Sequence, residues 1–208
     1  MIAITVSTNY DDLLQIIISH NYKFFEKWYI ITRKDDEHTL KVINTYNLEN
    51  IEIVFFDFKA KRACFNKGGA IRYVQEHIIK KNLCTSPILI LDSDIILPSN
   101  FMHLVKDIDI QADTLYGVEK RYDYYSNEAL LHNKPDTVWI ESERKDVLGF
   151  FQLYKNIDTF YDSSIDCSKC DLSFSRKFGK NNTIFGLDVK HLGKNGVNWK
   201  GRTVKDFK

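Results

Sequence analysis

Residues 88–94 read Ile88-Leu89-Ile90-Leu91-Asp92-Ser93-Asp94, four apolar residues followed by two carboxylates that lie two positions apart. A continuous apolar run is typical of a strand that is buried on both faces, as in a parallel sheet. Ligands of open α/β sheets bind at the carboxyl ends of the strands, where these aspartates would lie. Two carboxylates there cost free energy unless a cation compensates them. A divalent ion with oxygen ligands would do so, although the two side chains can also merely cap the strand.

The sequence on both sides of this stretch alternates between short apolar runs and longer amphipathic segments. Strands are predicted at residues 2–7, 28–32, 51–56 and 87–97. Helices are predicted between them at residues 11–20, 36–46 and 67–80. This alternation predicts an α/β fold with a mostly parallel central sheet and helices on both sides. After residue 101 the pattern weakens to strands at 114–118 and 147–154 and a short helix at 171–178, which indicates a smaller antiparallel portion.

The composition is that of an ordinary globular chain. Its 208 residues suffice to bury roughly 70% of the unfolded chain's surface, so one domain needs no disulfide. The formal net charge of +1 gives no overall basic field, so nucleic acid is not expected as a partner. No apolar run reaches the roughly 18 residues of a membrane span. We therefore expect a cytoplasmic protein without an integral membrane segment, whose four cysteines, including the C-x-x-C pair Cys167 and Cys170, are reduced thiols.

Two further segments carry groups that suit a phosphate. Residues 65–70 read Phe65-Asn66-Lys67-Gly68-Gly69-Ala70, and two glycines at the start of a predicted helix let backbone N–H groups approach a phosphate closely. Residues 191–202 contain His191, Lys194 and Arg202 among three glycines, and so offer a metal ligand and cations. Each segment also has a simpler interpretation, a plain helix start or a solvated basic tail. Together with the aspartates they supply a metal site, a backbone cradle and cations, which a nucleotide diphosphate needs.

These three motifs resemble those of GT-A-fold glycosyltransferases, in particular the short one-domain kind of bacterial polysaccharide loci and large DNA viruses. The resemblance covers most of the chain, from Ile2 to Arg202. It implies a Rossmann-like single domain over residues 1–208, with a nucleotide-sugar-binding half at 1–100 and an acceptor-binding half with a closing C-terminal tail at 101–208. It also implies Mn²⁺- or Mg²⁺-dependent transfer of a sugar from a nucleotide-diphosphate sugar, commonly a UDP-sugar, to a glycan or other hydroxyl acceptor.

The resemblance assigns roles residue by residue. The metal ligands would be Asp92, Asp94 and His191. The donor would contact Thr8, Asn9, Tyr10, Asp35, Asn66, Lys67, Gly69, Asp92, Ser93, Lys194 and Trp199. The transferred sugar would lie against Gly149, Phe151 and Gln152. Asp171 would be the catalytic base, with Asp166 and Asp188 as weaker alternatives, or else only the N-cap of the helix that follows it. A true base implies inversion at the anomeric carbon, whereas an acceptor-orienting role is compatible with retention.

Three other functions compete with this interpretation. A haloacid dehalogenase-like phosphatase also uses Asp-x-Asp after an apolar strand, but normally on the first strand rather than the fourth. A nucleotidyltransferase shares the nucleotide-binding sheet and the metal, but its usual glycine-rich loop is absent from Ser7-Thr8-Asn9-Tyr10. The third is a non-catalytic carbohydrate-binding relative that kept the fold. The retained polar residues argue against this last function.

Overall fold

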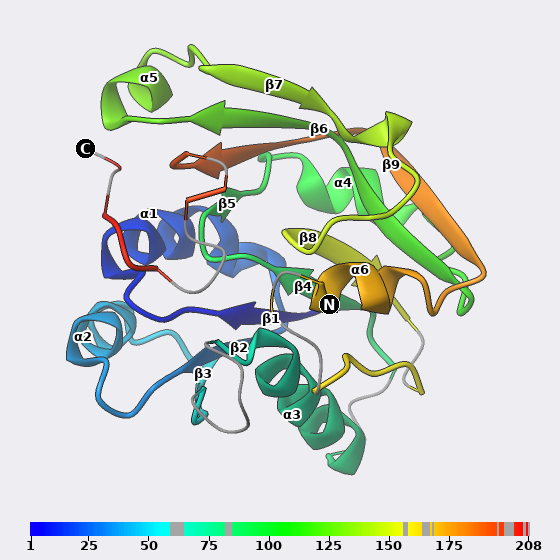
Figure 1. The fold of residues 1–208 in the computed structure, drawn as a ribbon, viewed down its shortest axis with the longest axis horizontal. Coiled ribbons are helices and arrows are strands. Elements are labelled where there is room, and N and C mark those ends of the chain that lie inside the picture. Colours follow the sequence, from blue (N-terminus) through cyan, green and yellow to red (C-terminus); the bar gives the residue numbers. More distant parts are fainter. Residues whose placement is uncertain are drawn as a thin grey trace.

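The first half of the chain builds parallel strands, as its continuous apolar runs predict (Figure 1). In this computed structural model, residues 1–58, 65–81, 85–155, 158–163, 167, 169–194, 196–197, 202–205 and 207 are described. The parallel strands are β1 (Ile2–Val6), β2 (Lys27–Thr32), β3 (Ile51–Phe55) and β4 (Ile88–Leu91). Within the described residues no helix is long and apolar enough to cross a membrane.

The second half completes the same sheet, mostly with antiparallel pairs. Its strands are β5 (Ile95–Ile96), β6 (Thr114–Tyr124), β7 (Thr137–Ile140), β8 (Phe151–Tyr154) and β9 (Lys180–Leu192). Over the described residues the sheet has nine strands in the order β3-β2-β1-β4-β8-β6-β9-β5, with β7 paired to β6. β8 is antiparallel to β4 and β6, whereas β6 and β9 are parallel to each other. The structure therefore confirms the predicted α/β class with a smaller antiparallel portion.

Helices cover both faces of the sheet because alternate side chains of a strand point to opposite sides. The helices are α1 (Asp11–Asn21), α2 (Glu37–Tyr46), α3 (Lys67–Lys80), α4 (Phe101–Lys106), α5 (Asn127–Leu131) and α6 (Cys170–Ser175). Short 3₁₀ turns occur at Tyr22–Phe24 and Glu141–Glu143. On one face Ala3 and Leu91 belong to the core that includes α1, α2 and α4. On the other face Ile4 and Ile90 belong to the core that includes α3 and α6.

The predicted strand at 87–97 is wrong in one respect, because it is two strands. β4 ends at Leu91, the chain turns through residues 92–94, and β5 begins at Ile95. β5 leaves its neighbour β4 and pairs instead with β9. Because apolar residues lie on both sides of the aspartates, the sequence pattern predicts one continuous strand and does not indicate this break.

The second half differs most from the sequence prediction. β6 continues to Tyr124 instead of ending at 118, and β7 and β9 were not predicted at all. In β9 the buried residues are Ile184, Leu187, Val189 and Leu192, whose alternation is interrupted around Gly186. Gly186 has a φ of 77°, and the register of β6 against β9 shifts near that point. A bulge of this kind breaks the period of two by which a strand is recognised.

Asn21 at the end of α1 holds the short strand β5 in place. Its Nδ2 donates to the carbonyl oxygen of Ile95 at 2.8 Å, and its Oδ1 accepts from the backbone N–H of Leu97 at 3.0 Å. All of these groups are buried. The amide thereby supplies the two backbone hydrogen bonds that β5 does not obtain from β4.

We predict that Asn21→Ala lowers the free energy of unfolding by about 2 to 4 kcal/mol, because it leaves two buried backbone groups unpaired. Urea unfolding followed by circular dichroism measures this. The control is Asn127→Ala at the exposed start of α5, for which a change of no more than about 0.5 kcal/mol is expected. Equal stability of the two variants would contradict the role of Asn21.

Candidate functional site

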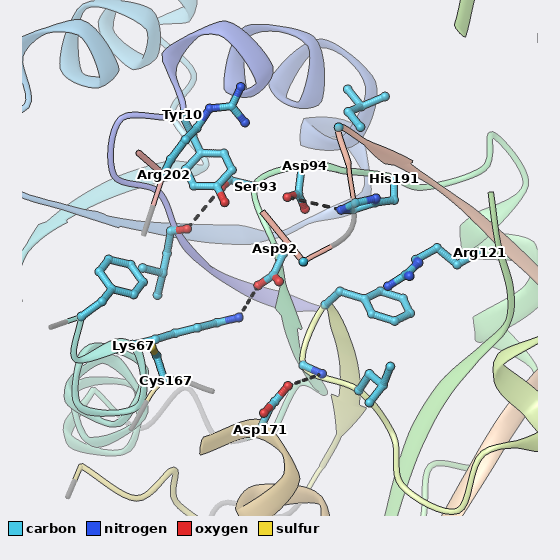
Figure 2. A pocket seen from close by; sticks show the side chains of 18 of the residues that line it. Tyr10, Lys67, Asp92, Ser93, Asp94, Arg121, Cys167, Asp171, His191 and Arg202 are labelled. Carbon is cyan, nitrogen blue, oxygen red and sulfur yellow. Dashed lines mark hydrogen bonds and ion pairs between the residues drawn. The ribbon is translucent and has the colours of Figure 1, made fainter. Parts of the chain in front are cut away.

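A cavity of about 250 Å³ opens where the chain leaves β1 and β4 (Figure 2). It lies at the carboxyl ends of these parallel strands, the position at which open α/β sheets bind ligands. Its charged and polar lining comes from segments far apart in the sequence. These residues include Tyr10, Lys67, Asp92, Ser93, Asp94, Arg121, Asp171, His191, Lys194 and Arg202.

Asp92 faces the ammonium group of Lys67. Lys67 is the first residue of α3, and its Nζ lies 2.6 Å from Asp92 Oδ1. Burial raises the pKa of Asp92 above its ordinary value, and the ammonium only partly offsets this. Burial alone would lower the pKa of Lys67, but Asp92 raises it, so the ammonium remains charged. The pair therefore brings one fixed positive charge into the cavity beside the first aspartate.

Asp94 faces the imidazole of His191 near the end of β9. His191 Nε2 lies 3.6 Å from Asp94 Oδ2, and its Nδ1 lies 3.1 Å from Asp123 Oδ1 on β6. Burial alone would raise the pKa of Asp94, but His191 reverses this and lowers it. Burial alone would lower the pKa of His191, but Asp94 and Asp123 raise it to about 9. The two aspartates of the motif thus have different cationic neighbours.

Asp171 lies across the cavity, in the first turn of α6. Its Oδ2 accepts the backbone N–H of Gly149 at 3.1 Å, and its Oδ1 accepts that of Leu172 at 2.9 Å. The helix begins at Cys170 and its N-cap residue is Lys169. Asp171 is therefore not the N-cap. One of its oxygens is bound to the segment that precedes β8, and the carboxylate lines the cavity.

Arg202 covers the cavity on the side of α1. Its guanidinium group lies 4.9 Å from the centroid of the Tyr10 ring, and its Nη2 is 2.6 Å from Asp12 Oδ2. Asn9 Nδ2 donates to the carbonyl oxygen of Arg202 at 3.4 Å. The backbone N–H of Asn9 in turn donates to Asp36 Oδ2 at 2.7 Å. These contacts bring the end of the chain against the first βα turn.

The other predicted site residues lie just outside the cavity lining or beyond the described residues. Asn66 caps α3 by accepting the N–H of Gly69 at 2.9 Å, so both shape the helix start that presents Lys67. Gln152 is buried and donates to the carbonyl oxygens of Val147 and Asp171. The remaining predicted residues outside the lining are Thr8, Asn9, Asp35, Phe151 and Asp188. Trp199 and Asp166 lie outside the described residues.

The predicted donor contact Asp35 is exposed, whereas its neighbour Asp36 is buried beside the end of β1. Asp35 is exposed and pairs with Arg33, whose Nε is 3.1 Å from Asp35 Oδ1. Asp36 is buried, caps α2 through the N–H of Thr39, and holds the backbone of Asn9. The sequence could not separate these neighbouring aspartates, because either one suits the position before a helix.

Several lining residues of the second half were not predicted as site residues, among them Arg121, Leu148 and Phe150. Arg121 on β6 is buried, and its guanidinium lies 4.9 Å from the centroid of the Phe150 ring. Leu148 and Phe150 complete that wall of the cavity. Asp123, beside His191, was also missed. The alternation of side chains along 118–124 would have placed Arg121 and Asp123 on one face, had β6 been predicted to its full length.

The residues suit a metal ion that shares its coordination with a ligand. Among the described residues no group of three or more His, Cys, Asp or Glu side chains is arranged to hold a metal by itself. Mg²⁺, however, is usually held by one or two carboxylates together with substrate phosphates. Asp94 Oδ1 is buried and has no hydrogen-bond partner in the described part of the chain. Asp92, Asp94 and His191 are thus the residues that could hold an ion, with oxygens of a bound phosphate completing the shell.

Comparison with known proteins identifies the fold. No family model and no curated protein matches this sequence. A solved glucose-1-phosphate thymidylyltransferase from Bacillus anthracis, in complex with sucrose, is 10% identical over 92% of this chain and 89% of its own, with a TM-score of 0.52. A solved 4-diphosphocytidyl-2C-methyl-D-erythritol synthase is 12% identical over 88% of each chain, with a TM-score of 0.51.

A more distant similarity is found with mouse xyloside xylosyltransferase 1 in its apo form. It is 12% identical over 74% of this chain and 65% of that protein, with a TM-score of 0.41. The first two similarities establish a shared α/β fold. At such low identity the activity has to be inferred from the side chains of the site.

We predict that Gly149→Ala displaces Asp171 and destabilises the protein by about 1 to 3 kcal/mol, because the cavity wall has no room for a methyl group. A Cβ at this position would lie 2.4 Å from Asp171 Cβ and 2.6 Å from its Oδ2. Urea unfolding and a crystal structure of the variant measure the two effects. At Gly117 a Cβ would meet only side-chain atoms of Val147, the nearest at 3.0 Å, so Gly117→Ala should cost less. The opposite ranking would contradict this packing argument.

Proposed function

We propose that this protein is a metal-dependent glycosyltransferase that moves a sugar from a nucleotide-diphosphate sugar, commonly a UDP-sugar, to a hydroxyl group of a glycan or similar acceptor. One observation carries the proposal. Two carboxylates two residues apart share a single cavity with an ammonium, an imidazole and a guanidinium group. These groups suit a diphosphate bound together with a divalent cation. The carboxylates would face the cation, and the ammonium and guanidinium groups would face the phosphates.

The diphosphate would lie between the aspartates and the cations around them. Lys67 and Arg202 line the same cavity as Asp92 and Asp94, and the exposed Lys194 lines it as well. Mn²⁺ or Mg²⁺ held by Asp92, Asp94 and His191 would act as a Lewis acid that stabilises the charge on the leaving diphosphate. Lys67 and Arg202 add donors for the same phosphate oxygens.

The nucleoside would lie at the end of β1, next to Tyr10. Tyr10 lines the cavity, and its ring already stacks with the guanidinium of Arg202. The hydroxyl groups of Ser7 and Thr8 are buried without a hydrogen-bond partner among the described residues. The aromatic face of Tyr10 is a suitable contact for a base. Ser7 and Thr8 lie outside the cavity lining, so Tyr10 is the contact that this segment offers inside the cavity.

Asp171 would take the proton of the acceptor hydroxyl group. The acceptor oxygen forms a bond to the anomeric carbon, the bond from that carbon to the diphosphate oxygen breaks, and the proton passes to the carboxylate. The Gly149 N–H fixes one carboxylate oxygen, which orients the group for this transfer. Phe150 and Leu148 supply an apolar wall beside it, against which a sugar ring can pack.

The strongest competing function is nucleotidyl transfer, since the two structures reported above with TM-scores of 0.52 and 0.51 are named as a thymidylyltransferase and a diphosphocytidyl-methylerythritol synthase. The turn after β1, Ser7-Thr8-Asn9-Tyr10, lacks the glycine-rich loop expected of a nucleotidyltransferase. The two activities have different products. Release of pyrophosphate from UTP and a sugar 1-phosphate would favour nucleotidyl transfer, whereas release of UDP from a UDP-sugar supports the glycosyltransferase.

We predict that Asp94→Ala abolishes Mn²⁺-dependent binding of UDP, because the variant loses a metal ligand next to the diphosphate. Calorimetric titration of UDP into the protein, with Mn²⁺ and then with EDTA, measures this. Asp107→Ala, at an exposed carboxylate after α4, is the matched control and should bind as the wild type does. Metal-dependent binding that survives in Asp94→Ala would refute the site assignment.

We predict that Asp171→Asn leaves UDP binding unchanged but lowers sugar transfer by about 100- to 10,000-fold, the range expected for loss of a general base. Asparagine keeps an oxygen that can accept the Gly149 N–H. Initial rates with a donor and acceptor pair, together with the calorimetric Kd for UDP, separate the two effects. Asp188→Asn is the control, because Asp188 accepts from Tyr122 on the neighbouring strand and lies outside the cavity lining. A larger loss in Asp188→Asn than in Asp171→Asn would move the base to Asp188.

A further inference from the structure

Asp123 is a fully buried carboxylate that lies behind the cavity rather than in it. It is near the end of β6, directly beside His191 in the parallel β6–β9 pair and beside Thr137 of β7. Its exposed fraction is 0%. The roles of Asp92, Asp94 and His191 in the cavity do not by themselves require a buried carboxylate at this position.

The contacts of Asp123 fix its carboxylate from three sides. Trp139 Nε1 donates to Oδ2 at 2.7 Å. Arg121 Nε lies 3.0 Å from Oδ1, and His191 Nδ1 lies 3.1 Å from the same oxygen. Arg121 is itself held between rings, 5.6 Å from the centroid of Trp139 and 4.9 Å from that of Phe150. The carboxylate therefore has little freedom to turn.

The charges around Asp123 are balanced without His191. Arg121 Nε also lies 3.9 Å from Glu141 Oε1, and Arg144 Nε lies 2.6 Å from Glu141 Oε2. Two guanidinium groups thus face two carboxylates in this network. The imidazole is therefore not needed to neutralise Asp123. The contact between the two side chains instead suits a role in orienting the imidazole ring.

The imidazole of His191 lines the cavity beside Asp94 (Figure 2) and is in contact with Asp123 behind the cavity. His191 Nδ1 lies 3.1 Å from Asp123 Oδ1, an ion-pair distance without hydrogen-bond geometry, and the opposite nitrogen Nε2 lies 3.6 Å from Asp94 Oδ2. Histidine ligands of metal ions commonly donate their second ring N–H to a carboxylate, which fixes both the tautomer and the ring orientation.

We infer that Asp123 is a positioning residue that holds His191 with Nε2 toward the ion shared with Asp94. This inference rests on the proposed metal–diphosphate site. Asp123 does not touch the ion or the substrate. It removes the rotational freedom of the imidazole before the ion binds, so that less conformational entropy is lost on binding.

The test is Asp123→Asn, which keeps the size of the side chain and removes its charge. Electron paramagnetic resonance titrations of Mn²⁺ in the presence of UDP measure the affinity for the ion. We expect binding about 10- to 100-fold weaker than in the wild type, the effect usual for a carboxylate behind a metal-bound histidine. Thermal unfolding checks that the variant is folded.

A double-mutant cycle with His191→Gln separates positioning from a general structural role. If Asp123 acts through His191, Asp123→Asn weakens Mn²⁺ binding in the wild-type background and has no further effect in the His191→Gln background. Additive losses in the two backgrounds would overturn the inference. Asp188→Asn, on the same strand as His191 but bonded to Tyr122, is the matched control and should leave Mn²⁺ affinity unchanged.

A measurement on the wild-type protein covers the case in which Asp123→Asn does not fold. Electron spin-echo modulation of the Mn²⁺–UDP complex detects a coordinated imidazole nitrogen, and the signal should vanish in His191→Gln. Absence of that signal in the wild type overturns the inference. No binding of Mn²⁺ with UDP by the wild type would refute the proposed function itself, and this inference with it. Wild-type binding that Asp123→Asn leaves within about twofold refutes only the inference.

Discussion

The site depends on one constraint, which is that two carboxylates at the end of a buried strand have to be compensated by cations. β4 contains no basic residue next to Asp92 and Asp94. The positive charges that compensate these carboxylates therefore come from other parts of the chain. Lys67 at the start of α3 serves the first, and His191 at the end of β9 serves the second. Burial raises the pKa of Asp92, whereas His191 lowers that of Asp94. The two carboxylates of the turn therefore have different cationic neighbours, Lys67 and His191.

Each of these cations is held by contacts behind it. Asn66 caps α3 through the N–H of Gly69 and so fixes the helix start that presents Lys67. Asn21 bonds both ends of β5, the strand that β9 follows to bring His191 beside the turn. Buried polar groups of this kind cost free energy unless they are paired, and here the pairing also sets the geometry of the cavity. The supporting residues thus contribute to function through the positions of other side chains.

The fold alone leaves the chemistry open. Solved structures with the same α/β architecture are named as nucleotidyl- and cytidyl-type enzymes, at 10% and 12% identity. In this chain the second half places Gly149, Phe150 and Asp171 in a wall of the cavity that the Asp92–Asp94 turn also lines, and one oxygen of Asp171 is fixed by a backbone N–H. This carboxylate is the general base of the sugar transfer proposed above.

The sequence by itself determined the parallel first half and the carboxylates at its edge, because continuous apolar runs, helix caps and strand-end aspartates are local signals. The helix-start signal also placed Asn66 and Lys67 near a site, whereas Asp171 was predicted from the resemblance to GT-A glycosyltransferases. Only the tertiary structure decided that Asp36 rather than Asp35 is buried, that β5 separates from β4, and that Arg121 lines the cavity with Asp123 behind it. The positions of Arg121 and Asp123 rest on β6 and β9, whose pairing joins residues about 66 positions apart. The bulge between these strands interrupts the period of two by which a strand is recognised. Contacts over such distances depend on the packing of the whole sheet, which no local stretch of sequence encodes.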